Sequence, residues 1–258
     1  MIFQQHQNLS PSKMRPHSIA RARLALLGMS MALLSACAQI NPGQPGYWAL
    51  NTSEGLQPHL VDIQATSFQG QDALAVELTP GAQKALLEQN GTANGASYAK
   101  VPVSFKNGTI EVDVAARINS KGPADVRGFV GIAFHLDDQD KTFEALYLRM
   151  TNGTANNPPP PAPRNEYGVQ YISIPGRDWK TLRQTYPNRY EKAAPVAIER
   201  WHKLRLEIQN STLRAFVDQT PVLEVPNLSY PGRQGAIGLW VDDGTTGYFR
   251  NLKITSQD

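Results

Sequence analysis

The chain has 258 residues, with 25 Lys and Arg against 22 Asp and Glu, and a single cysteine. One cysteine excludes an intramolecular disulfide and a zinc site built from several thiolates. The first 36 residues hold four cations and no acid, so the rest of the chain carries 21 Lys and Arg against 22 Asp and Glu. This near-neutral remainder has no basic stripe with interleaved aromatic residues, and a nucleic acid partner is therefore not expected.

The N-terminal segment has the composition of a secretory signal peptide. Basic residues between Lys13 and Arg23 precede the apolar run 24–34, which is too short to span a bilayer. The run ends in Leu34-Ser35-Ala36-Cys37, which resembles the lipobox of bacterial lipoproteins. The resemblance implies a lipoprotein signal peptide at residues 1–36, cleavage before Cys37, and lipidation at Cys37.

Lipidation at Cys37 predicts a stable membrane anchor, since two or three acyl chains hold a protein where one does not. The next residue is Ala38 and not Asp, which in Gram-negative bacteria implies the outer membrane, with the protein facing the periplasm. Residues 37–47 are expected to form a lipidated tether, because the segment 41–46 holds two Pro and two Gly. Residues 48–258 remain for one domain, and their number suits a single β-sandwich.

Short segments with alternating apolar and polar residues follow one another through this domain, which predicts β-strands. In chain order they are 59–64, 73–78, 98–105, 109–118, 127–136, 143–150, 167–174, 201–208, 213–218, a short strand within 219–226, 235–241 and 248–254. Asn107-Gly108 predicts a tight hairpin. Residues 80–90 fit either a short helix or an exposed excursion. The proline run 158–163 predicts a stiff loop at one end of the sandwich, and 175–200 is expected to be polar and irregular.

The hairpin formed by 127–136 and 143–150 has two faces of different composition, and each predicts a different environment. Alternation predicts that one face of the first strand packs into the core; that face holds Val130, Ile132, Phe134 and Leu136. The other face of the hairpin combines small residues with three larger polar or aromatic ones; it holds Gly131, Ala133, His135, Ala145, Tyr147 and Arg149. We interpret this second face as the floor of a shallow groove.

The order of the last segments resembles the concanavalin A-like lectin/glucanase superfamily, especially its laminin-G-like members. The segments that carry the resemblance are Trp201-His-Lys-Leu-Arg-Leu-Glu-Ile208, Leu213-Arg-Ala-Phe-Val-Asp218, Val222-Leu223, Gly235-Ala-Ile-Gly-Leu-Trp240 and Phe249-Arg-Asn-Leu-Lys-Ile254. The resemblance implies an all-β antiparallel sandwich, the jelly roll, and a sugar ligand on its concave sheet or at the rim.

Five residues are predicted to share this concave face and to bind a glycan: His135, Tyr147, Arg149, Tyr171 and Trp240. Aromatic rings cover the apolar faces of a pyranose, and a guanidinium pairs with a carboxylate on an acidic sugar. In the alternative interpretation, Tyr147 and Trp240 form a second small core beneath a loop, and Arg149 pairs with Glu111 or Asp113.

Two enzyme classes compete with simple sugar binding, as does a structural or protein-binding envelope module. Glucanases of the resembled superfamily place acids as Glu-x-Asp-x-x-Glu, whereas Glu111 and Asp113 are followed by no third acid. A polysaccharide lyase would use residue types present in His135, Tyr147, Arg149 and Gln170. The favoured hypothesis is a membrane-anchored lectin-like protein, and no catalytic residue is assigned.

No cofactor or metal ion is predicted, although two acidic turns leave calcium open. Residues 137–140 and Asp242-Asp243-Gly244-Thr245 carry the oxygen ligands that calcium prefers, but such turns more often have no metal. The three histidines after residue 37 are His59, His135 and His202, and their spacing matches no helical metal motif.

Overall fold

The computed structural model describes residues 46–88 and 95–257. The predicted signal peptide, Cys37 and nearly all of the tether lie outside these residues. Within them, none of the helices combines the length and apolarity that crossing a bilayer requires.

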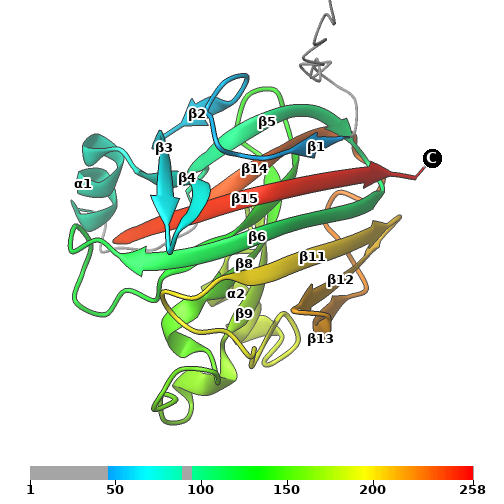
Figure 1. Ribbon diagram of the computed structural model, residues 1–258. Helices are drawn as coiled ribbons and strands as arrows, with labels where there is room; N and C mark the ends of the chain where they lie inside the picture. Colours follow the sequence, from blue (N-terminus) through cyan, green and yellow to red (C-terminus); the bar gives the residue numbers. More distant parts are fainter. Residues whose placement is uncertain (1–45, 89–94, 258) are drawn as a thin grey trace, which may run out of the picture. The chain divides into compact units, whose positions relative to one another are not determined.

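The described chain forms two antiparallel sheets packed face to face, which confirms the predicted β-sandwich (Figure 1). The eight-stranded sheet has the order β13-β12-β11-β6-β15-β4-β3, and β1 pairs with β15. Its strands are β1 (Tyr47–Trp48), β3 (Val61–Phe68), β4 (Gln71–Leu78), β6 (Gly108–Ile118), β11 (His202–Gln209), β12 (Thr212–Val217), β13 (Thr220–Val225) and β15 (Thr245–Ser256).

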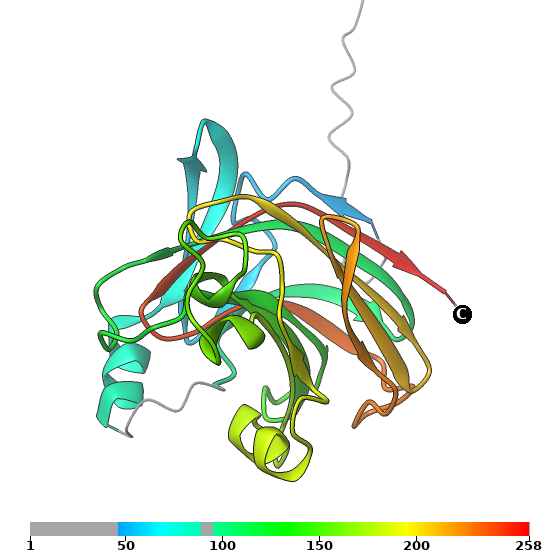
Figure 2. The ribbon, with the colours of Figure 1, turned by 90° about the horizontal axis from the view of Figure 1, so that it is seen from below.

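The seven-stranded sheet has the order β10-β9-β8-β7-β14-β5-β2. Its strands are β2 (Gln57–His59), β5 (Tyr98–Phe105), β7 (Phe129–Leu136), β8 (Phe143–Arg149), β9 (Val169–Ile174), β10 (Glu191–Lys192) and β14 (Gly235–Val241). Figure 2 shows the eight-stranded sheet arching over this second sheet. The outer face of the seven-stranded sheet is therefore the place to look for the predicted groove.

Two α-helices and two 3-10 turns complete the described elements. Helix α1 (Pro80–Glu88) forms because Thr79 accepts a hydrogen bond from the Ala82 amide at 3.2 Å, and this resolves the choice left open for residues 80–90. Helix α2 (Trp179–Thr185) falls in a segment expected to be irregular. Asp178 caps it by accepting from the amides of Lys180 and Thr181 at 2.8 and 2.9 Å. The 3-10 turns are η1 (Met150–Asn152) and η2 (Arg164–Glu166).

The core between the sheets follows the predicted alternation over most strands. On β6 and β11 every second side chain is buried; these are Ile110, Val112, Val114, Leu204, Leu206 and Ile208. They meet Val130, Ile132 and Phe134 from β7. Burying each such side chain stabilises the fold by about 1.5 to 3 kcal/mol.

A β-bulge at the end of β7 breaks this alternation and corrects one prediction. The register between β7 and β14 shifts between Ala236 and Gly238, and His135 adopts a φ of 52°. One extra residue reverses which face the following side chains occupy. Leu136 was predicted to pack with Phe134 in the core. It packs instead with the cluster on the outer face of the sheet.

On the outer face, glycines let aromatic rings lie flat against the sheet. Gly131 pairs with Tyr147 on one side and Trp240 on the other, and the two rings stack over it with centroids 4.7 Å apart. A Cβ at Gly131 would lie 2.3 Å from the Leu146 carbonyl oxygen and 2.5 Å from the Tyr147 Cα. The space left by this small residue is thus filled by the protein itself.

We predict that Gly131→Ala destabilises the fold by about 3 kcal/mol, because the contacting atoms are backbone and only a strand shift relieves the overlap. Gly81→Ala is the matched control: Gly81 lies in α1 with open space around its Cα, so alanine is expected to be neutral or mildly stabilising. Urea denaturation followed by circular dichroism measures both. Equal urea midpoints for Gly131→Ala and Gly81→Ala would contradict the explanation that only glycine fits beneath the stacked rings.

Candidate functional site

The five residues predicted to bind a glycan are all buried, none of them more than 5 % exposed. They also do not share one face of the sheet. Tyr171 pairs with Leu146 and points with it into the sandwich core, and the bulge turns His135 inward as well. The prediction of a common outer face is therefore wrong for His135 and Tyr171, and correct for Tyr147, Arg149 and Trp240.

His135 and Tyr171 meet inside the sandwich at the carboxylate of Glu144. The His135 Nδ1 lies 2.7 Å from one carboxylate oxygen, while the Tyr171 hydroxyl and the Ser229 amide donate to the other at 2.5 and 2.7 Å. The second His135 nitrogen lies 2.9 Å from the Lys106 carbonyl oxygen. These side chains have no solvent-exposed surface, and their hydrogen bonds stabilise the interior of the sandwich.

Tyr147 and Trp240 belong to a second cluster of buried apolar side chains on the outer face of the seven-stranded sheet. The Trp240 indole donates to the Gly95 carbonyl at 3.0 Å and stacks on Tyr147. The alternative interpretation of these two rings as a small core is thus the one that the structure supports. That interpretation also paired Arg149 with Glu111 or Asp113, and this part is wrong, because the guanidinium pairs with Glu191.

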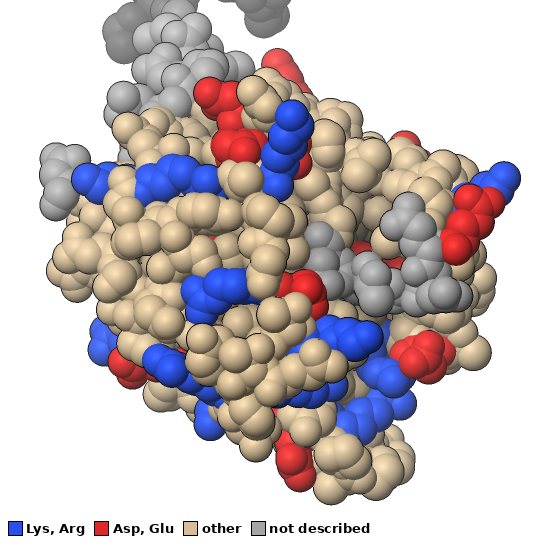
Figure 3. Space-filling view, turned by 180° about the vertical axis from the view of Figure 1, so that it is seen from behind, with Lys and Arg blue, Asp and Glu red and all other residues tan. Residues whose placement is uncertain are grey.

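A cavity of about 380 Å³ opens at the end of this cluster, beside Tyr147 and Arg149. Five segments line it: the β6–β7 loop with the start of β7, β8 with η1, the proline-rich loop with the residues after it, α2, and the β14–β15 turn. The polar and aromatic members are Asp125, Arg127, Phe129, Tyr147, Arg149, Asn152, Arg164, Tyr167, Trp179, Arg183 and Asp243. Figure 3 views this side of the molecule and shows Lys and Arg side chains gathered in its lower right part.

Glu191 on β10 organises one wall of this pocket by binding two arginines. Arg183 donates from Nε and Nη2 to its two carboxylate oxygens at 2.6 and 2.5 Å, and Arg149 approaches at 3.3 Å. The hydrogen bonds to Glu191 raise the pKa of Arg183. The Arg183 guanidinium lies 4.2 Å from the ring centre of Tyr167 and 4.9 Å from that of Trp179. Both aromatic rings are therefore fixed beside the pocket.

Arg149 also orients the Tyr147 hydroxyl at the floor of the pocket. It donates to the Tyr147 oxygen at 3.2 Å and to the Gln170 side-chain oxygen at 3.1 Å. Burial raises the pKa of Tyr147 to about 12, with Arg149 opposing the shift. The phenol is therefore neutral at physiological pH and keeps its proton for donation.

Two consecutive acids in the β14–β15 turn have strongly perturbed titration. Burial, followed by repulsion from Asp125, raises the pKa of Asp243 to about 6, and Arg127 opposes the rise. Burial, followed by repulsion from Asp243, raises the pKa of Asp242 well above its usual value. Each has one buried carboxylate oxygen without a hydrogen-bond partner among the described residues. A perturbed, incompletely bonded carboxyl group that lines a pocket is a candidate general base.

The sequence reading of these acidic turns as open to calcium finds no support in the described residues. No group of three or more His, Cys, Asp or Glu side chains there is arranged to hold a metal ion. The acid–base character of Asp242 and Asp243 was not predicted, because it depends on the burial of the turn that follows β14. The only available signal was two acids placed directly after the apolar end of β14.

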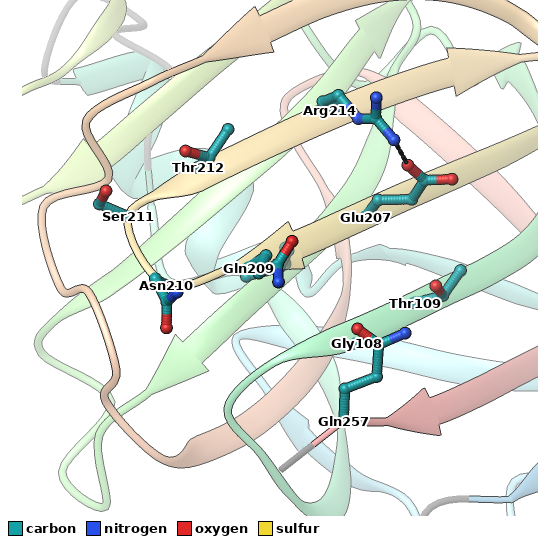
Figure 4. A pocket seen from close by; sticks show the side chains of 10 residues that line it. Gly108, Thr109, Glu207, Gln209, Asn210, Ser211, Thr212, Arg214 and Gln257 are labelled. Atoms are coloured by element: carbon teal, nitrogen blue, oxygen red, sulfur yellow. Dashed lines mark hydrogen bonds and ion pairs between the residues drawn. The ribbon is translucent and has the colours of Figure 1, made fainter.

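The outer face of the eight-stranded sheet offers weaker candidates. A polar hollow near the β11–β12 turn holds Glu207, which Arg214 binds at 2.5 Å, and its lining contains no aromatic ring (Figure 4). Asp113, one of the two acids considered for hydrolysis, accepts from Lys203 and Asn251 at 2.8 and 2.7 Å. Its charge is engaged in surface pairing, which argues against a role as nucleophile.

Comparison with known proteins places the fold and the family. Residues 65–255 match the 3-keto-alpha-glucoside-1,2-lyase-like domain. The chain belongs to this family. The matched range includes every residue that lines the pocket beside Tyr147, whereas no curated protein sequence matches the chain.

Solved structures support the concanavalin A-like jelly roll of this chain. The carbohydrate-binding module CBM66 from Bacillus subtilis aligns with a TM-score of 0.51 at 15 % identity, over 78 % of this chain and 96 % of that one. A protein of unknown function with a galectin-like fold, also from Bacillus subtilis, aligns with a TM-score of 0.50 at 11 % identity, over 83 % of this chain and 97 % of that one. At these identities the likeness concerns the fold alone.

The raised pKa of Asp243 predicts a pH-dependent cost to stability. The folded state binds a proton more tightly than the unfolded chain, so stability falls as pH rises from about 4 to 6 and stays lower above that window. The rise of the pKa from 3.8 to about 6 corresponds to a loss of about 3 kcal/mol in the free energy of unfolding above this window. Asp243→Asn is therefore expected to be more stable than the parent at pH 8, with a gain that vanishes near pH 4.

Urea midpoints of both proteins across pH 4 to 8 measure this difference. Asp138→Asn, which changes an exposed acid in another turn, is the control and should show no such pH-dependent gain. A gain for Asp243→Asn that is the same at pH 4 and pH 8 would show that Asp243 is not the titrating group.

Proposed function

We propose that the protein binds a sugar in the pocket beside Tyr147 and Arg149 and cleaves a keto-glucoside there by elimination. The observation that carries this proposal is Asp243, a 4 % exposed carboxyl group with a pKa of about 6 and an unbonded oxygen, placed among arginines. Family membership points to the same substrate class, since the family is described by a 3-keto-alpha-glucoside and a 1,2-lyase.

The pocket has the size and the groups that a sugar requires. A volume of about 380 Å³ lies within the range of small-ligand sites. Phe129, Tyr167 and Trp179 supply apolar surface for the C–H groups of a sugar ring, and Asn152 supplies polar atoms for its hydroxyls. The two aromatic walls need no rearrangement on binding, because Arg183 already fixes them.

The chemistry of a 3-keto sugar suits these groups. The ketone at C3 acidifies the C–H bond at C2, so a carboxylate with a pKa near neutrality is an effective base. In the reaction that we propose, Asp243 takes the C2 proton, the C1–O bond breaks, and a C1=C2 double bond forms. Arg127 stabilises the negative charge that develops on the C3 oxygen.

The departing glycosidic oxygen needs a proton, and Tyr147 is the proposed donor. Its hydroxyl is neutral, because its pKa is about 12, and it lines the same pocket. Arg149 stabilises the phenolate that forms, through the hydrogen bond already present at 3.2 Å. Each turnover leaves Asp243 protonated and Tyr147 ionised, so loss of the proton from Asp243 and uptake of one by Tyr147 restore the starting state, and no redox partner is needed.

Asp243→Asn is expected to lower kcat by at least about 100-fold on a 3-keto-α-glucoside, because an amide cannot accept the C2 proton. The appearance of the unsaturated ketone is followed by ultraviolet absorbance with the full-length protein. Asp138→Asn is the control and should keep the parental rate. Full activity of Asp243→Asn would contradict the proposed base. Binding without turnover in the parent would assign the pocket to a lectin-like sugar-binding module.

We further propose that the protein is a lipoprotein of the outer membrane that faces the periplasm, anchored only through Cys37. This rests on the lipobox-like sequence at residues 34–37 and on Ala38. Cys37→Ala is expected to abolish incorporation of labelled palmitate and to move the protein from the membrane to the soluble fraction. Ser35→Ala, which keeps the thiol, should leave both unchanged. A Cys37→Ala protein that still takes up label would contradict lipidation at this position.

A further inference from the structure

The pocket beside Tyr147 contains more positive charge than its own acids neutralise. Its guanidinium groups come from four separate segments: Arg127, Arg149, Arg164 and Arg183. The carboxylates beside them are Asp125, Asp243 and Glu191. Because the pKa of Asp243 is about 6, part of the negative charge of Asp243 is lost in mildly acidic solution. An anion in the pocket would complete the balance.

Two of the four arginines are already satisfied within the protein. Arg149 and Arg183 share the carboxylate of Glu191, and Arg149 also donates to Tyr147 and Gln170. Glu191 is buried and uses both carboxylate oxygens for these contacts. This pair therefore forms a fixed wall and is not the main anion-binding group.

Arg164 is different, because both of its hydrogen-bond partners are neutral. Its Nε donates to the Asn152 side-chain oxygen at 2.9 Å, and its Nη2 donates to the Thr151 hydroxyl at 2.6 Å. Among residues 46–88 and 95–257, no acid forms an ion pair with it. The side chain is thus held in position with its charge uncompensated.

Arg127 forms one ion pair, with Asp125, and is attracted without direct contact by Asp243. Its Nη2 lies 3.2 Å from Asp125, whose side chain is 77 % exposed, so water screens most of the attraction. Burial lowers the pKa of Arg127 first, and repulsion from Arg164 and Arg149 adds to the decrease. Arg127 and Arg164 line the same cavity and repel one another, and an anion between them relieves that repulsion.

We infer that the sugar bound in this pocket carries an anionic group, a carboxylate, sulfate or phosphate, held between Arg127 and Arg164. A guanidinium binds each of these groups through paired hydrogen bonds. The inference rests on the proposed function for the sugar itself and adds the substrate class. The neutral rings of Tyr167 and Trp179 contact the sugar, and the two arginines select its charge.

Isothermal titration of the full-length protein at low ionic strength tests this inference. The probes are methyl α-D-glucopyranoside, its 6-carboxylate analogue methyl α-D-glucopyranosiduronate, glucose 6-sulfate and glucose 6-phosphate. At least one anionic sugar is expected to bind ten times or more tightly than the neutral glucoside. The advantage should shrink as sodium chloride is raised. The comparison among the three anions identifies the group that fits.

Arg164→Gln is expected to reduce this preference to less than threefold while the affinity for the neutral glucoside stays within twofold. Arg200→Gln, a change of an exposed arginine outside the pocket, should leave the preference unchanged. If Arg164→Gln proves unstable in thermal melting, Arg164→Lys keeps the charge without the planar fork and should weaken the preference partially.

The two levels of the proposal fail differently. Equal or weaker binding of every anionic sugar, with clear binding of the neutral glucoside, overturns the anion inference and leaves sugar binding intact. A preference that Arg164→Gln does not change also overturns it, since the selecting group then lies elsewhere. Absence of binding by all four probes overturns both the inference and the proposed sugar site.

Discussion

The centre of the seven-stranded sheet, strands β7 and β8, is buried on both faces, and this constraint decides where a ligand can bind. Every side chain of β7 and β8 is buried, inward against the eight-stranded sheet or outward beneath the Tyr147–Trp240 cluster. The usual open surface of a lectin-like sheet is therefore closed along these strands. Arg149, at the end of β8, lines the pocket, which therefore forms at that end of the sheet.

Glu191 makes this end rigid. It joins three elements that are distant in the sequence: β10, the end of β8 through Arg149, and α2 through Arg183. A buried carboxylate shared by two guanidiniums is costly to break, since loss of one partner leaves an uncompensated charge worth about 3 to 5 kcal/mol. The same contacts place Tyr147, Tyr167 and Trp179, so the pocket is preorganised by an interaction that a ligand does not have to form.

The alternation of apolar residues predicted most strands and their inward side chains, because the period-two pattern directly reflects the geometry of a strand. It failed at the bulge near His135, where the strand departs from that period and Leu136 changes face. On β9 the period holds, but pairing with β8 places Tyr171 beside Leu146 on the inner face and not on the outer one. Alternation also says which face a side chain occupies but not what covers it, so Trp240 was predicted at a surface and is buried. The pocket itself joins residues from five segments, and no local pattern predicts such a meeting.

Arg127 links the two parts of the proposed site, because it acts on both the base and the ligand. Burial raises the pKa of Asp243, while the positive charge of Arg127 pulls it down toward 6. An anionic group bound between Arg127 and Arg164 offsets part of that positive field, and the pKa of Asp243 then rises further. A carboxylate with a higher pKa is a stronger base, so binding of the correct sugar strengthens the group that is to take its C2 proton. Binding of the anion and activation of the base therefore depend on the same charge, that of Arg127. A neutral sugar in the same pocket would leave the pKa of Asp243 where it is and would face a weaker base.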